Sequence, residues 1–136
     1  MSHNVVHGSV IGVGRSARRA VVIATAAVAN GLAWLGGQHA HVDYVVQTPL
    51  GTRQITLFIV IVATTVSGLA GWAVFSLLER HTSNTVRAWI ALAALVLASS
   101  IVPIFVLRAE LDTRLSLTAL HCIAAAILTA GLPQTR

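Results

Sequence analysis

The chain has 136 residues, of which 56% are hydrophobic and only 10% are charged, and its formal net charge is +5. An ordinary soluble domain is about 45–50% apolar and about 25% charged, and a small domain leaves much of its surface in contact with water. The composition therefore excludes an ordinary soluble domain and predicts a membrane protein.

Four apolar stretches are long enough to cross a bilayer, whose hydrocarbon core requires about 20 apolar residues per helix. They cover residues 20–36, 55–78, 86–107 and 115–132, and residues 1–14 before them are predicted to be a flexible cytoplasmic segment. No domain boundary is evident along the chain. The sequence thus predicts one all-α domain over residues 1–136, an integral membrane bundle of four transmembrane helices with antiparallel up-down topology.

The first apolar stretch has a second interpretation, as a cleaved signal peptide. A basic segment at residues 15–19 precedes the apolar run, and Ala27 and Ala29 give the small-x-small pattern of a cleavage site. However, the arginines begin late in the chain, and the apolar run continues past this pattern to Leu35. These features favour a first helix that is retained.

The distribution of arginine predicts the orientation, since the chain contains no lysine. Positive residues stay on the cytoplasmic side of short loops. Six arginines fall on the side of the N-terminus (Arg15, Arg18, Arg19, Arg80, Arg87 and Arg136), and three fall on the other (Arg53, Arg108 and Arg114). We therefore expect an N-in/C-in, multi-pass membrane protein. Arginines at helix ends contact lipid headgroups, so the expected partner is the lipid bilayer, and nucleic acid is not expected.

The longest loop, residues 37–54, lies outside in this arrangement. Its Val42–Val46 part is predicted to be a short strand or an interfacial segment, and a turn is expected at Pro49-Leu50-Gly51. Alternate residues of an extended chain share a face, so His39, His41 and Asp43 could converge on a metal ion. The other interpretation of these three residues is a polar loop without a metal.

Few polar residues lie within the apolar stretches. At about 1.5 Å per residue, Asn30, Ser99, Ser100 and His121 have a similar depth in the outer half of the bilayer. They predict either a hydrogen-bond network joining the first, third and fourth helices, or a site for a lipophilic ligand or a proton. Haem ligation by two histidines would require two copies of the chain, because each supplies one membrane-embedded histidine. No cofactor is expected.

Small residues recur at helical spacing in the apolar stretches and predict close helix packing, within the chain or between copies. They include Ala27 and Gly31 in the first stretch, Gly68 and Gly71 in the second, and Ala91, Ala94 and Ala98 in the third. No set of residues typical of a catalytic site is evident, and Glu79-Arg80-His81 is interpreted as a solvated, salt-bridged helix end. The sequence therefore does not predict an enzyme.

Two known families invite comparison. Small multidrug transporters are similar in length and helix number, but they carry a glutamate in the first span, which this chain lacks. The segments VDYVV, GWAVFSLLERHTSNTVRAW and SLTALHCIAAAILTAGL resemble a family of small actinobacterial membrane proteins, a domain of unknown function. The resemblance covers residues 16–133 and is clearest at Leu78-Glu79-Arg80, Trp89, Pro103 and His121. It implies a four-helix membrane protein from a high-GC bacterium, and therefore a multi-pass protein of the bacterial plasma membrane. It implies no activity.

Three classes of function follow from these observations. The first is a non-enzymatic scaffold or accessory subunit, acting as a homo-oligomer or with a larger membrane protein. The second is a binder of a lipophilic small molecule or lipid through Asn30, Ser99, Ser100 and His121, which an outward-opening cavity would favour. The third is a transporter or membrane-enzyme component that uses His121, which an activity titrating near the imidazole pKa would favour.

Overall fold

The computed structural model describes residues 6–136 of the chain, and side chains from residue 14 onward. Its elements follow the order α1 (Val6–His39), β1 (Val45–Thr48), β2 (Gly51–Gln54), α2 (Leu57–His81), α3 (Thr85–Val106), α4 (Leu111–Gly131) and a short 3-10 helix, η1 (Leu132–Thr135). The fold is therefore almost entirely helical, with one small hairpin between α1 and α2.

Four of the helical segments are long and apolar enough to cross a membrane, which confirms the predicted four-helix membrane bundle. They are Gly14–His39, Leu57–His81, Thr85–Val106 and Leu111–Thr135. Helix α1 extends beyond the predicted span at both ends, because no proline occurs before Pro49 to interrupt it. Of the segment expected to be flexible, residues 6–14 are helical, and residues 1–5 lie outside the described residues.

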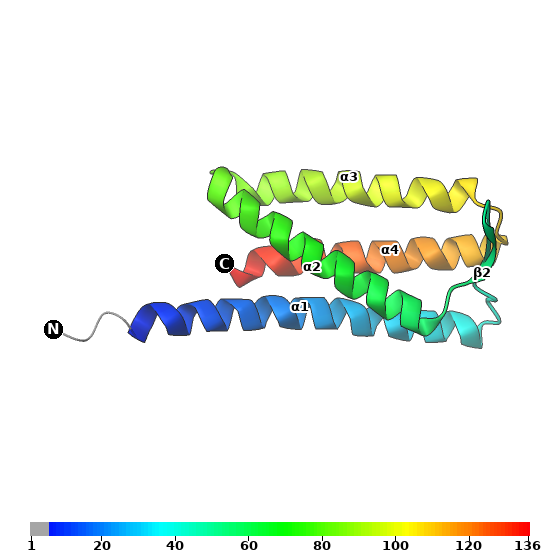
Figure 1. The fold of residues 1–136 in the computed structure, drawn as a ribbon, viewed down its shortest axis with the longest axis horizontal. Coiled ribbons are helices and arrows are strands. Elements are labelled where there is room, and N and C mark those ends of the chain that lie inside the picture. Colours follow the sequence, from blue (N-terminus) through cyan, green and yellow to red (C-terminus); the bar gives the residue numbers. More distant parts are fainter. Residues whose placement is uncertain (1–5) are drawn as a thin grey trace.

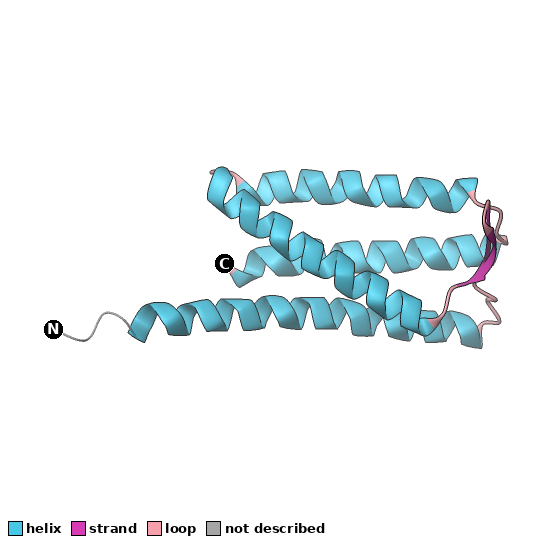
Figure 2. Ribbon diagram, in the orientation of Figure 1, coloured by secondary structure: helices cyan, strands magenta, loops and turns pink. Residues whose placement is uncertain are grey.

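The four helices lie roughly along one axis, and successive helices run in opposite directions (Figure 1). The C-terminus, the α2–α3 loop and the beginning of α1 lie at one end of the bundle, which we call the terminal end. The hairpin and the α3–α4 loop lie at the other, the hairpin end (Figure 2). Helix α2 crosses the bundle obliquely, so that α1 packs against α2 and α4, whereas α3 packs mainly against α4.

Glycines allow the close approach of α1 to its two neighbours. A Cβ atom at Gly68 of α2 would lie 2.8 Å from Cγ2 of Ile23 on α1, and one at Gly131 of α4 would lie 2.6 Å from Cγ1 of Val22. Real Cβ atoms do not approach other carbons so closely, so only glycine fits at these two crossings. The prediction that Gly68 serves helix packing is thereby confirmed, within a single chain.

A strand is present at the hairpin end, but it includes only the last two residues of the predicted Val42–Val46 segment, because the backbone of Tyr44 is left-handed. Strands β1 and β2 pair antiparallel from Val45↔Gln54 to Thr48↔Gly51, with the turn at the expected Pro49 and Leu50. The hydroxyl of Thr48 donates a hydrogen bond to the Gly51 carbonyl, at 2.9 Å. The backbone amide of Gln47 also donates to the Arg108 carbonyl, at 2.9 Å, so the hairpin is tied to the α3–α4 loop.

Tyr44 closes this end of the bundle from within. Its side chain is buried, its ring stacks on Trp34 with centroids 5.5 Å apart, and Trp34 Nε1 donates to the Ile55 carbonyl at 3.0 Å. The backbone of Tyr44 is left-handed, with φ of 52°, a conformation that is costly for a residue other than glycine. Burial of the ring in the cluster with Val42, Val60 and Leu120 offsets this cost.

Candidate functional site

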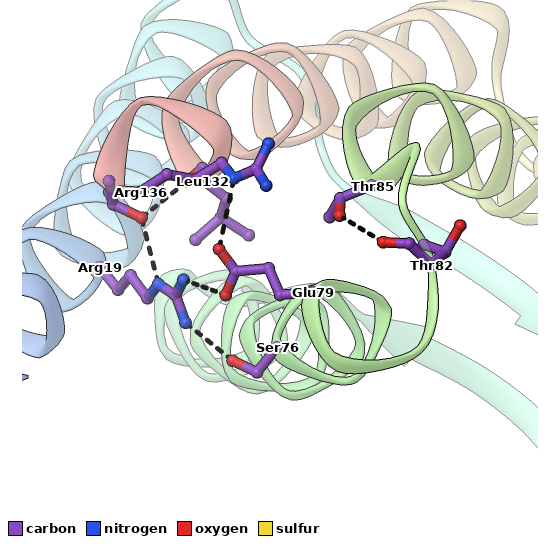
Figure 3. Close-up of polar contacts among 8 residues, drawn as sticks. Arg19, Ser76, Glu79, Thr82, Thr85, Leu132 and Arg136 are labelled. Carbon is purple, nitrogen blue, oxygen red and sulfur yellow. Dashed lines mark hydrogen bonds and ion pairs between the residues drawn. The ribbon is translucent and has the colours of Figure 1, made fainter.

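A buried arginine connects three segments at the terminal end. The side chain of Arg19, on α1, is 6% exposed. Its guanidinium donates three hydrogen bonds, from Nε to Thr135 Oγ1 at 3.1 Å, from Nη1 to Ser76 Oγ at 2.8 Å, and from Nη2 to Glu79 Oε2 at 2.7 Å (Figure 3). Arg19 thus links α1 by hydrogen bonds to the end of α2 and to the 3-10 helix η1.

The charge of Arg19 is compensated locally. Glu79 is an ion-pair partner at 2.7 Å, and its other oxygen lies 3.6 Å from Nε of Arg136. The guanidinium carbon also lies 5.5 Å from the centroid of the Phe75 ring, which presents its negative face to a cation. A buried charge requires partners of this kind, because an unpaired one would be strongly destabilising.

Sequence reasoning missed this network, because it interpreted Arg19 as a determinant of membrane orientation and Glu79 as part of a solvated, salt-bridged helix end. The salt bridge is present, and Arg80 and His81 are exposed, but the Glu79 side chain is only 19% exposed, so the expectation that it is solvated is wrong. One signal was available. Arg19 precedes the first apolar stretch and Glu79 follows the second, so antiparallel helices bring the two charges to the same depth.

A recess of about 510 Å³ opens beside this network. It is lined by Arg15, Arg19, Ser76, Glu79, Arg80 and Arg136, and we call it the arginine recess. The four arginines come from α1, α2 and the C-terminus, whereas the lining holds a single acidic side chain. Such a site is suited to an anion.

The sequence of this chain matches a known family over a range that includes the arginine recess and the predicted residues Asn30, Ser99, Ser100 and His121. The sequence model of a family of unknown function, DUF6069, matches residues 12–136. The chain belongs to this family. The expected membership in a family of unknown function is thereby confirmed, and the family description assigns no activity to any residue. No curated protein and no solved structure matches the chain.

Asn30 is buried, but its partner is not one of the residues predicted to accompany it. Its Nδ2 donates to Oγ1 of Thr64 on α2, at 2.9 Å, and the Thr64 hydroxyl donates to the Val60 carbonyl at 2.8 Å. The Oδ1 atom of Asn30 is buried without a hydrogen-bond partner among the described residues. Asn30 therefore connects α1 with α2, and it retains one free acceptor.

The other three predicted residues bond within their own helices. Ser99 and Ser100 donate to the carbonyls of Leu95 and Leu97, each at 2.8 Å, and His121 Nδ1 lies 2.8 Å from the Leu117 carbonyl. Such bonds to the preceding turn satisfy a side chain without a second helix. In the part of the chain that the structure describes, no hydrogen bond joins any two of Asn30, Ser99, Ser100 and His121. A role for them in ligand binding stays a prediction.

The three residues predicted to bind a metal lie at the hairpin end. His39 is the last residue of α1, and residues 40 and 41 form a turn in which His41 has φ of 62°. The segment is therefore not extended through all three residues, and their side chains do not share a face as expected. Among residues 14–136, whose side chains the structure describes, no group of three His, Cys, Asp or Glu residues is placed to hold a metal ion.

A second recess, of about 540 Å³, lies at the hairpin end between the hairpin and the α3–α4 loop. Its charged lining residues are Asp43, Arg108, Glu110 and Arg114. Nε of Arg114 is buried and has no hydrogen-bond partner among the described residues. Because the two signs of charge are balanced here, this recess has no preference for an anion or a cation, in contrast to the arginine recess.

Proposed function

We propose that this chain is a non-enzymatic scaffold or accessory subunit of the bacterial plasma membrane, with the terminal end in the cytoplasm. The excess of arginine near that end supports the orientation. The resemblance to actinobacterial proteins supports a bacterial membrane of high-GC origin. The proposed activity is association with another transmembrane helix.

The observation that carries this proposal is an uncovered face of α3. Ala91, Ala94, Leu95, Ala98 and Val102 are all exposed, and their spacing places them along one side of the helix. Small residues in such a row allow another helix to approach closely. Helix α3 offers this face because it packs mainly against α4 and meets α2 only near the terminal end.

The proposed occupant is the same face of a second copy. The alanines form a shallow strip, and Leu95 and Val102 project beside it. The face thus contains both the hollow and the side chains that can fill it, which is the requirement for a symmetric interface between identical subunits. An accessory subunit would use the same strip for a helix of a larger membrane protein.

Cysteine cross-linking in native membranes tests this interface. Because Cys122 is exposed, the variants are made in a Cys122→Ser background. Ala94→Cys should give a disulfide-linked dimer on mild oxidation. Val96→Cys is the matched control, because it is exposed on the same helix but points away from the strip. Equal cross-linking at both positions, or none at Ala94→Cys, would contradict the proposal. A disulfide to another protein would support the accessory role.

The proposed orientation has its own test. Thr52→Cys lies on the hairpin and Ser83→Cys lies in the α2–α3 loop, and both positions are exposed. In the Cys122→Ser background, a membrane-impermeant maleimide should label Thr52→Cys in intact cells and Ser83→Cys only after permeabilisation. The reverse pattern would contradict the N-in/C-in arrangement.

A second candidate is the binding of a lipophilic small molecule or lipid through the predicted polar residues. The observation that favours it is the unpartnered Oδ1 of Asn30, a buried acceptor that a ligand hydroxyl could satisfy. Native mass spectrometry of gently extracted protein should then show a bound molecule that Asn30→Leu loses and Thr65→Val, a change of a side chain bonded within its own helix, retains. A molecule-free wild type would contradict this candidate.

A further inference from the structure

The arginine recess carries more positive charge than the protein itself compensates. Arg19 and Glu79 are paired at 2.7 Å, and Nε of Arg136 lies 3.6 Å from the other carboxylate oxygen of Glu79. Arg15 and Arg80 have no ion-pair partner among the side chains of residues 14–136, although both line the recess. Two guanidinium groups are therefore available for a ligand, and a third is only weakly engaged.

Membrane orientation alone does not explain this arrangement. A cytoplasmic bias places arginines at one end of the bundle, but it does not direct them around one recess. Arg18 and Arg87 lie at the same end, are exposed and do not line the recess. Arg15, Arg80 and Arg136 instead converge from α1, from the end of α2 and from the C-terminus.

Ser76 adds a neutral donor to the same surface. Its Oγ accepts the hydrogen bond from Nη1 of Arg19, so its hydroxyl hydrogen remains available. Thr64, Thr65 and Ser99 donate their hydroxyl hydrogens to a carbonyl of the preceding turn, whereas Ser76 makes no such bond in the described part of the chain. A hydroxyl donor among guanidinium groups matches the oxygens of a phosphoryl group.

We propose that the arginine recess binds the phosphoryl group of an anionic phospholipid headgroup. Guanidinium groups bind phosphate through paired N–H donors, and the recess supplies them from Arg15, Arg80 and Arg136. The Arg19–Glu79 pair forms the wall of the recess and keeps the three segments at a fixed separation. A zwitterionic headgroup is disfavoured, because the recess offers one carboxylate, and Arg19 already occupies it.

The surroundings favour a lipid over free phosphate as the source of this group. Leu77 is 55% exposed and lies three residues, about one helical turn, before Arg80 on α2, so the two side chains are neighbours on the helix surface. Leu77 belongs to a segment that can cross the membrane. An acyl chain can lie against this side chain while the phosphoryl group occupies the recess at the level of the other headgroups.

Native mass spectrometry of the full-length chain tests the proposal, with matched variants. The probes are diphosphatidylglycerol, phosphatidylglycerol and phosphatidylethanolamine, each added to delipidated protein, and inorganic phosphate and pyrophosphate as soluble competitors. Arg15→Gln/Arg80→Gln removes two charges from the recess and leaves the Arg19–Glu79 pair intact. Arg18→Gln/Arg87→Gln removes two charges from the same end outside the recess.

Wild type should retain the two anionic lipids over phosphatidylethanolamine. The recess variant should bind them about tenfold more weakly, which corresponds to about 1.4 kcal/mol, and the control should change less than twofold. Displacement of the bound anionic lipids by millimolar pyrophosphate would support recognition of their phosphoryl groups. Binding of pyrophosphate without retention of either anionic lipid would assign the site to a soluble anion and overturn the proposal. Equal losses in both variants, or equal retention of phosphatidylethanolamine, would overturn the proposal. If the double variant unfolds, Arg15→Gln and Arg80→Gln are measured singly, each with an expected threefold loss.

Discussion

The two ends of the bundle are held together by different kinds of interaction. At the terminal end, the guanidinium of Arg19 connects α1 to α2 and η1 through three side-chain hydrogen bonds. At the hairpin end, a buried tyrosine ring and backbone hydrogen bonds hold the hairpin against the bundle and the α3–α4 loop. The terminal end therefore depends on a few charged side chains, whereas the hairpin end depends on the packing of an aromatic ring and on backbone hydrogen bonds.

The largest effect is expected from Arg19→Met. The change leaves Glu79 partly buried with only the distant Arg136 as a partner, and removal of one member of a buried ion pair costs about 3–5 kcal/mol. The midpoint of unfolding by SDS should therefore fall strongly. Arg18→Met is the control, because Arg18 is exposed on the same helix turn, and an equal loss there would contradict the assignment.

The double variant Arg19→Met/Glu79→Met sharpens the same point. A buried ion pair can often be replaced by apolar side chains at little cost, so the double variant should be more stable than Arg19→Met alone. A double-mutant cycle measured by SDS unfolding gives the coupling energy. Additive losses would mean that the two side chains do not interact energetically.

At the hairpin end, Tyr44→Ala should lower the free energy of unfolding by about 2–4 kcal/mol, because a buried aromatic ring leaves a cavity against Trp34. Thermal unfolding in detergent measures the change. Leu50→Ala, at a loop position that is 90% exposed, is the control and should have no effect.

Two neighbouring glycines provide a smaller and more specific test of the tyrosine site. A methyl group at Gly37 would overlap the hydroxyl of Tyr44, whereas a methyl group at Gly36 would meet nothing within 4 Å. Gly37→Ala should thus be destabilising by about 1–3 kcal/mol through overpacking. Gly36→Ala should be neutral or stabilising, because alanine favours the helix. Similar melting temperatures for the two variants would show that Tyr44 does not pack here.

The smallest effect is expected from His121→Ala. The imidazole contacts a carbonyl of its own helix, not another helix, and hydrogen bonds between side chains in membranes contribute only about 0.6 kcal/mol on average. The melting temperature in detergent should therefore change by no more than one or two degrees. A large decrease in melting temperature would instead support the predicted hydrogen-bond network joining the first, third and fourth helices.

Several features were predictable because they depend on local sequence. Apolar length predicted the four helices and Pro49-Leu50-Gly51 predicted the turn, whereas the strand begins three residues later than predicted. The predicted hydrogen-bond network among the polar residues was wrong, because residues at equal depth in the membrane need not be in contact. Ser99 and His121 lie at a suitable depth, but their side chains are satisfied by carbonyls one turn away. Asn30 instead meets Thr64, on a helix that the prediction did not include.

The sequence by itself determined that this protein is a four-helix membrane protein, because the length and apolar character of a segment are sufficient for it to cross a bilayer. Only the tertiary structure decided which polar and charged groups meet. Arg19 and Thr135 are far along the chain from each other and from Ser76 and Glu79, and the crossing of α2 over α1, with α4 packed beside α1, brings the four together. That crossing depends on close contacts such as Gly68 against Ile23, and the packing of helices in lipid is set by such contacts rather than by hydrophobicity.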